Sequence, residues 1–188
     1  MKNVIIFHGT CSQEEYYSDN FPSLSNSHWL PWLQKQLLIQ GYYVQTPEIF
    51  EAFDPRYEDW KKELERFNIN EETILIGHSC GGGFLTRWLS EKEIKIDKLI
   101  LVAPWLDPER EKTTDFFDFN IDENLEKKCN EIHLFVSSDD DSDILESVAI
   151  IKNKIKNISF HEFSDKGHFT YDDMKTDKFP ELFHTVIS

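Results

Sequence analysis

The stretch from Thr73 to Phe84 reads TILIGHSCGGGF and decides the fold class of the chain. Its first four residues form a continuous apolar run, which is typical of a strand buried on both faces. The run leads into GHSCG at residues 77–81, a match to the pattern G-x-S-x-G. Apolar residues at helical spacing follow, from Phe84 to Leu89. A strand, a sharp turn and a helix in this order predict one unit of an α/β sheet.

The same alternation of strand and helix continues through the chain of 188 residues. Further strands are predicted at residues 4–7, 42–45, 98–103, 132–136 and 158–163, and further helices at residues 28–40, 57–67, 144–155 and 179–187. Strands separated by helices predict a six-stranded, mostly parallel sheet with right-handed crossovers and helices on both faces. We expect a single domain over residues 1–188, in which residues 105–128 form an insertion or a small cap.

The composition excludes several classes of protein. Lys and Arg number 20 and Asp and Glu 35, so the formal net charge is −15. Such a surface repels phosphates, which disfavours nucleic acids and anionic membranes as partners. Cys11, Cys80 and Cys129 form no CxxC unit, so we expect no disulfide framework and a reducing, cytoplasmic compartment. The apolar run at the start is too short for a signal peptide or a membrane span.

Ser79 is the candidate nucleophile. In a sharp strand–turn–helix unit, the hydroxyl projects into the crevice at the carboxyl edge of the sheet, and flanking glycines avoid a clash of β-carbons. The alternative is an incidental serine in a glycine-rich turn. A phosphate-binding loop does not fit, because no Gly-Lys-Ser or Gly-Lys-Thr follows. The neighbouring Cys80 side chain is expected to point away from the crevice, as a packed thiol.

His168 is the candidate general base. A serine hydroxyl needs a base to take its proton, and in this kind of fold the base follows the nucleophile and the acid in the chain. His168 lies in DKGHF at residues 165–169, just after the last predicted strand and therefore at the same edge as Ser79. The alternative is a solvated loop histidine. His133 and His161 fall inside strands, and His184 falls on the surface of the last helix.

The candidate acid lies in the run Asp139–Asp141, which follows the strand at residues 132–136. We select Asp141, because Ile144 and the next residue mark the start of a helix three and four positions later. Asp140 is a close competitor. A solvated acidic turn at a helix N-terminus accounts for part of the run. We expect no metal, because residues 139–143 lack the glycine of a calcium loop.

An oxyanion hole needs two backbone N–H groups near the nucleophile. One is expected at Cys80, which follows Ser79. The other is expected in the loop after the first strand, where Thr10 follows His8 and a turn glycine. We interpret His8 and His78 as residues that orient their loops rather than as bases.

These motifs together resemble the small serine hydrolases related to retinoblastoma-binding protein 9. The resemblance rests on HG at residues 8–9, HWLPWLQ at 28–34, GHSCG at 77–81, SSDDDSD at 137–143 and KGHF at 166–169. It implies a minimal α/β-hydrolase fold with strand order 2-1-3-4-5-6 and a triad of Ser79, Asp141 and His168. From the candidate residues we expect hydrolysis of small acyl esters or amides through an acyl-enzyme, and the resemblance does not specify the substrate.

The expected ligand is therefore a small acyl substrate, with no cofactor. Trp105 and the phenylalanines at 116, 117 and 119 form either the wall of an acyl pocket or ordinary core. A catalytically weak protein-binding module and an acyl thioesterase remain as alternatives. The thioesterase needs a basic patch for nucleotide phosphates, which the acidic composition disfavours.

Overall fold

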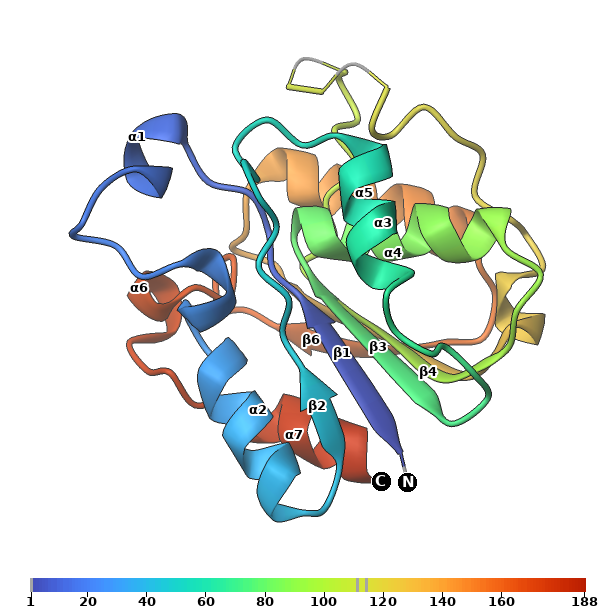
Figure 1. Cartoon of the computed structure of the whole chain (residues 1–188). Coiled ribbons are helices and arrows are strands. Elements are labelled where there is room, and N and C mark those ends of the chain that lie inside the picture. The colour runs from blue at the N-terminus through green and yellow to red at the C-terminus, as the bar shows by residue number, and fades with distance from the viewer. Residues whose placement is uncertain (1, 111, 114) are drawn as a thin grey trace.

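The centre of the molecule is a six-stranded sheet in which every pair of neighbours is parallel (Figure 1). The computed structural model describes residues 2–110, 112–113 and 115–188. The strands are β1 (Asn3–Phe7), β2 (Tyr43–Gln45), β3 (Thr73–His78), β4 (Ile96–Val102), β5 (Cys129–Ser137) and β6 (Ile158–Phe163). Their order is β2-β1-β3-β4-β5-β6. The six strands and this order confirm the predicted fold class, and the sheet is wholly rather than mostly parallel.

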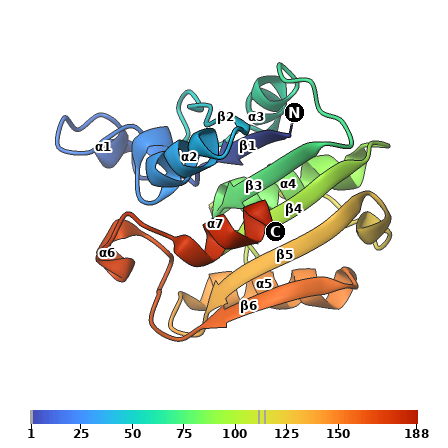
Figure 2. The ribbon, with the colours of Figure 1, turned by 90° about the horizontal axis from the view of Figure 1, so that it is seen from below.

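Five longer helices cover the two faces of the sheet (Figure 2). One face carries α2 (Leu30–Ile39) and α7 (Pro180–Ile187), and the other carries α3 (Tyr57–Leu64), α4 (Cys80–Glu91) and α5 (Ser142–Lys154). Aromatic contacts join the helices of each layer. The rings of Trp29 and Phe179 meet edge to face at 5.9 Å, and those of Trp60 and Phe84 lie 5.5 Å apart.

The apolar strand runs are explained by burial on both faces. Every residue of β3 is buried, and Val4 to Phe7 of β1 have no exposed surface. The Phe7 ring packs toward Phe84 on one face, at 5.1 Å. On the other face, the Phe135 ring of β5 meets Phe179 at 5.4 Å. A strand between two helical layers has no polar side, so alternation of polar and apolar residues is lost.

The structure adds four single-turn elements that the sequence pattern did not predict. These are α1 (Gln13–Tyr16), η1 (Leu24–Asn26), η2 (Leu125–Lys127) and α6 (Tyr171–Met174). A single turn is too short to show a hydrophobic period. Two of the new elements, α1 and α6, lie at the same end of the sheet, apart from each other (Figure 1). That end is the carboxyl edge, where the candidate residues gather.

Described residues of the segment 105–128 pack against α4. The Arg87 guanidinium donates hydrogen bonds to the carbonyls of Asp115 and Phe116, at 2.6 and 2.7 Å. Phe116 and Phe117 are fully buried against the aromatic core. Among the described residues, no helix has the length and apolar character needed to span a bilayer.

Candidate active site

Ser79 occupies the turn between β3 and α4 in a conformation that is rare for a residue with a side chain. Its φ of 54° and ψ of −123° lie outside the regions that L-residues normally adopt. The surroundings hold it there. Its N–H donates to the carbonyl of Val102 at 2.9 Å, and its own carbonyl accepts from the N–H groups of Gly82 and Trp105. A strained residue fixed from both sides in this way is typical of a functional position.

Two glycines allow the chain to close around Ser79. A β-carbon on Gly81 would collide with the carbonyl oxygens of His8 and Phe7, so α4 can begin against β1 only with glycine there. A β-carbon on Gly9 would lie 2.9 Å from the β-carbon of Ser79. The loop after β1 therefore runs directly alongside the candidate nucleophile.

His168 lies in the loop after β6 and shares the walls of two cavities with Ser79. Its backbone is fixed by side chains from two other segments. The His168 carbonyl accepts a hydrogen bond from Nε2 of His78 at 2.8 Å, and the His168 N–H donates to Oδ2 of Asp173 at 3.0 Å. The imidazole itself is 27% exposed. The loop is thus held rigidly while the ring stays accessible from the cavities.

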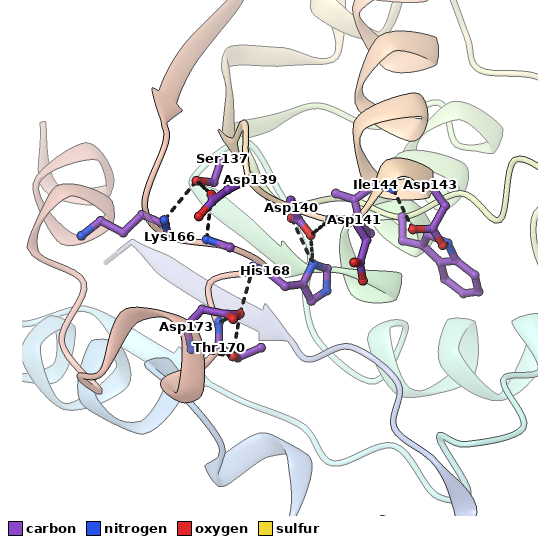
Figure 3. Close-up of polar contacts among 12 residues, drawn as sticks. Ser137, Asp139, Asp140, Asp141, Asp143, Ile144, Lys166, His168, Thr170 and Asp173 are labelled. Atoms are coloured by element: carbon purple, nitrogen blue, oxygen red, sulfur yellow. Dashed lines mark hydrogen bonds and ion pairs between the residues drawn. The ribbon is translucent and has the colours of Figure 1, made fainter.

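The carboxylate beside the base belongs to Asp140 (Figure 3). Nδ1 of His168 lies 3.0 Å from Oδ1 and 3.1 Å from Oδ2 of Asp140, whose side chain is only 1% exposed. A carboxylate accepts, so Nδ1 carries a proton and Nε2 is left as the basic nitrogen. Our selection of Asp141 as the partner of His168 is corrected by this geometry in favour of the competitor, Asp140.

Asp141 begins α5 instead. It occupies the N-cap position, is exposed, and its carbonyl accepts the N–H groups of Ile144 and Leu145 at 3.1 Å. Its own N–H donates to Oδ1 of Asp140 at 2.7 Å, which helps to orient that carboxylate. The nearby start of a helix, on which the selection rested, therefore identified the cap of α5 rather than the acid. The preceding residue is the one whose carboxylate reaches the edge of the sheet.

Asp139 has a third role in the same run. Its Oδ1 accepts from the hydroxyl of Ser137 at 2.5 Å and from the N–H of Gly167 at 3.1 Å (Figure 3). The Ser137 hydroxyl lowers the pKa of the Asp139 carboxyl. Asp139 thus ties the end of β5 to the loop that carries His168.

The two expected oxyanion donors lie beside Ser79. Thr10 borders both cavities that Ser79 and His168 border. Cys80 is the first residue of α4, where N–H groups lack an acceptor inside the helix and the helix dipole favours negative charge. The Cys80 thiol is fully buried, and burial raises its pKa well above the usual value. The thiol is therefore packed and protonated, as predicted.

His8 and His78 are structural, in agreement with their interpretation as loop-orienting residues. Nδ1 of His8 donates to the carbonyl of Gly9 at 2.6 Å, and its Nε2 accepts the N–H of Ile49 at 3.0 Å. Nε2 of His78 donates to His168, as described above. Burial lowers the pKa of His8 and lowers that of His78 well below its ordinary value. Both rings are thus held neutral.

His28 is a member of the site that the sequence analysis missed. It has a positive φ of 57° and borders the same cavity as Ser79 and His168. Its Nδ1 accepts the N–H of Tyr171 at 3.1 Å, at the start of α6. Burial, followed by the charge of His168, lowers the pKa of His28. The chain order of the fold predicts the base downstream of the nucleophile, whereas His28 lies 51 positions upstream; the HWLPW motif that contains it was the available signal.

The two cavities differ in their walls. One, of about 270 Å³, is bordered by Phe21, Leu24 and His28 in addition to the residues above. The other, of about 210 Å³, is bordered by Trp105, whose Nε1 donates to Asp143 at 3.0 Å. The sequence leaves open whether Trp105 and the three phenylalanines line a pocket or belong to the core. Trp105 lies at the site. The phenylalanines at 116 and 117 belong to the core, and that at 119 packs against it.

Metal-ligand side chains are not grouped in the described part of the chain. No three or more His, Cys, Asp or Glu side chains there are placed to hold one ion. The chemistry open to these residues is that of a serine, an imidazole and a carboxylate in sequence, flanked by backbone N–H groups.

The fold and the strained serine turn are those of the α/β hydrolases. Comparison with known proteins narrows this class. The family model described as serine hydrolase matches residues 21–186, and the chain belongs to that family. The putative hydrolase YdeN of Bacillus subtilis (strain 168) is 24% identical over 168 residues, which is 86% of this chain and 88% of that protein. The narrower resemblance to retinoblastoma-binding protein 9 stays a prediction.

Solved structures agree on the fold. The B. subtilis ydeN product superposes with a TM-score of 0.80 at 24% identity, over 100% of this chain and 97% of that one. Est1E from Butyrivibrio proteoclasticus superposes with a TM-score of 0.64 at 15% identity, over 99% of this chain and 86% of that one. The esterase domain of a Rhodothermus marinus protein superposes with a TM-score of 0.62 at 16% identity, over 98% of this chain and 84% of that one.

Proposed function

We propose that the chain is a hydrolase of small acyl esters or amides in which Ser79, His168 and Asp140 act together. The observation that carries the proposal is the bond from Nδ1 of His168 to the buried Asp140 carboxylate. That bond leaves Nε2 of His168 basic, in a ring that shares its cavities with the strained Ser79.

The reaction follows from these positions. Nε2 of His168 takes the proton of the Ser79 hydroxyl as its oxygen attacks the substrate carbonyl. The imidazolium that results is stabilised by the Asp140 carboxylate. The developing oxyanion is stabilised by the N–H groups of Thr10 and Cys80, at the positive end of α4. His168 then gives its proton to the leaving group, and an acyl-Ser79 ester remains.

A second round removes the acyl group. Nε2 of His168 takes a proton from water, the resulting hydroxide attacks the acyl-Ser79 carbonyl, and the proton returns to the serine oxygen. The acid is released and the free enzyme is restored. The carboxylesterase-like activity is part of this proposal, and the esterase domain among the solved neighbours supports it. The cytoplasmic location and a small-molecule acyl partner also remain proposals.

A fluorophosphonate probe tests the proposal directly, because it labels only an activated serine. We expect the unmodified protein to be labelled and Ser79→Ala to lose labelling completely. Ser159→Ala, at an exposed serine on β6, is the matched control and should label normally. Circular dichroism checks that both variants are folded. Labelling that persists in Ser79→Ala, or a folded parent protein that does not label, contradicts the proposal; the second result favours a binding module.

A further inference from the structure

A further cavity adjoins the one that contains Ser79. It has a volume of about 260 Å³ and lies under the segment between β1 and α2. Two residues, Glu15 and Leu24, border both cavities, so the two form neighbouring compartments with a common wall. The outer compartment is also bordered by Cys11, Tyr16, Pro22, Ser23 and Glu48. The mechanism above makes no use of this outer compartment.

Hydrogen bonds fix the walls of the outer compartment. The Glu48 carboxylate accepts the N–H groups of Leu24 at 3.2 Å and Ser25 at 2.8 Å, which ties η1 to the segment after β2. The Tyr16 hydroxyl accepts the N–H of Glu51 at 3.1 Å, which ties α1 to the same segment. Because its walls are held from three parts of the chain, the compartment is a built feature of the fold.

The size of this space suits a compact apolar group, and its lining combines apolar surface of Tyr16, Pro22 and Leu24 with the side chains of Glu15 and Glu48. An engineered protein cavity of about 150 Å³ is enough to hold benzene, so a compartment of about 260 Å³ accommodates a phenyl ring or a short alkyl chain. Leu24 forms the shared wall, and Phe21 stands at the rim of the catalytic cavity with its side chain 54% exposed. An exposed ring at the mouth of a pocket gains free energy when a ligand covers it.

Charge sets a second requirement. The half-buried Glu15 borders both compartments, and the chain as a whole carries a formal charge of −15. A ligand group that ends in a carboxylate would be brought next to Glu15, where like charges repel.

We propose that the outer compartment binds one arm of the substrate, an uncharged and apolar group with the bulk of a phenyl ring or a short alkyl chain. The inference rests on the proposed function, because Ser79 must attack the carbonyl from which that arm extends. The arm belongs either to the acyl group or to the alcohol. The chemistry of recognition is the same in both cases, and two series of substrates distinguish them.

In the first series, p-nitrophenyl esters carry acyl chains from acetyl to octanoyl, and phenylacetyl. In the second, acetate esters carry alcohols of the same lengths, with acid release followed by a pH indicator. We expect kcat/KM to rise about fourfold for each methylene buried in one of the two series, until the compartment is full. A rise in either series supports the proposal and identifies the arm. Two flat series overturn it.

Variants locate the effect. Phe21→Ala should reduce the preference of long over short substrates about threefold, and Ser23→Trp, which fills the outer compartment from its edge, should abolish it. Tyr43→Ala is the matched control, since Tyr43 is 57% exposed but lies on β2, at the opposite end of the sheet from Ser79. An unchanged preference in both Phe21→Ala and Ser23→Trp contradicts the proposal.

Charge is tested with an ester whose acyl or alcohol arm ends in a carboxylate, compared with the uncharged ester of equal length. The charged ester should be turned over at least tenfold more slowly, and Glu15→Gln should recover part of the difference. Equal rates for the two esters contradict the charge requirement. If acetate esters are hydrolysed and labelling depends on Ser79 while both series stay flat, this inference fails and the proposed function stands. If no ester is hydrolysed and no label is taken up, the proposed function itself fails.

Discussion

The two edges of the sheet carry cavities of very different size and chemistry. The larger, of about 780 Å³, lies at the amino edge and is bordered by the segments before β3, β4 and β5. Three of its charged groups form ion pairs, because Lys128 meets Asp122 at 2.8 Å and Glu93 at 3.7 Å. The smaller, of about 270 Å³, lies at the carboxyl edge and is bordered by Ser79, by His168 and by two histidines that interact with His168, namely His28 and His78.

The comparison shows that volume is a poor guide to function in this molecule. At the amino edge, opposite charges offset each other in ion pairs such as those of Lys128. That cavity is a solvated groove between loops. At the carboxyl edge, the strained Ser79 and the neutral histidines leave reactive groups facing an open space. The following predictions test that contrast, from the largest expected effect to the smallest.

The largest effect is expected from removal of the base. His168→Ala should lower kcat/KM for an activated ester by about 10⁴-fold or more, because the Ser79 hydroxyl then has no proton acceptor. Lys127→Ala, at the border of the amino-edge cavity, is the control and should stay within twofold. Steady-state kinetics measure both. A comparable loss in Lys127→Ala would show that the two edges are not functionally distinct.

The next effect separates the neighbouring acids. Asp140→Asn should lower kcat about 10²- to 10⁴-fold, because the amide no longer stabilises the imidazolium and favours the wrong tautomer of His168. Asp141→Asn should cost less than tenfold, because the Asp141 side chain makes no hydrogen bond to the first turn of α5 and none to His168. If Asp141→Asn lowered kcat more than Asp140→Asn did, Asp141 would be the catalytic acid, in contradiction to the geometry in Figure 3.

The third effect concerns stability. Gly81→Ala should lower the free energy of unfolding by about 3 kcal/mol, because its β-carbon meets backbone oxygens that cannot move aside. In a chain of this length the loss corresponds to a fall in Tm of roughly 10 °C. Lys95→Ala, exposed at the amino edge, should change the free energy by less than about 0.5 kcal/mol. Thermal denaturation followed by circular dichroism compares them, and equal midpoints for the two variants would contradict the close packing at the elbow.

The smallest effect is a dependence of stability on pH. The pKa values of His8 and His78 are lowered in the folded state by burial, so the unfolded chain binds more protons below its ordinary histidine pKa of about 6.5. The stabilisation is complete above that pH and is lost as the pH falls below it. Between pH 7 and 5.5 His78, whose pKa lies well below the ordinary value, should cost about 1 kcal/mol, and His8 acts in the same direction. Denaturant titrations of the parent and of His78→Gln should differ in slope by about one proton; parallel pH profiles would show that His78 titrates normally.

The strands and the sharp turn at Ser79 could be predicted because they depend on local sequence. The apolar run before Ser79 is typical of a strand that is covered on both faces. The glycines around Ser79 indicate a turn that is too tight for other residues. His168 could be predicted because its loop follows the last strand, which places it at the same edge of a parallel sheet.

The remainder depends on side-chain direction and on distant segments. Asp140 rather than Asp141 faces His168 because of how the backbone turns between β5 and α5, where a shift of one residue exchanges the two side chains. The spacing of apolar residues in the sequence does not reveal this turn. His28 is brought to the site by tertiary contacts of its ring, with the N–H of Tyr171 and with the ring of His78. The single turns α1 and α6 depend on caps, Ser12 on Glu15 and Thr170 on Asp173, which are short local signals that we did not use.

The three consecutive aspartates that follow β5 have a consequence for how this chain can change over time. One ties down the base loop, the next holds the imidazole, and the third starts a helix. Each task belongs to a place along the backbone, and chemically identical neighbours cannot exchange tasks. Deleting any one of the three codons yields the same shortened protein, in which two aspartates remain for three backbone positions. We therefore expect this triplet to tolerate a change in length far less well than its repetitive composition suggests.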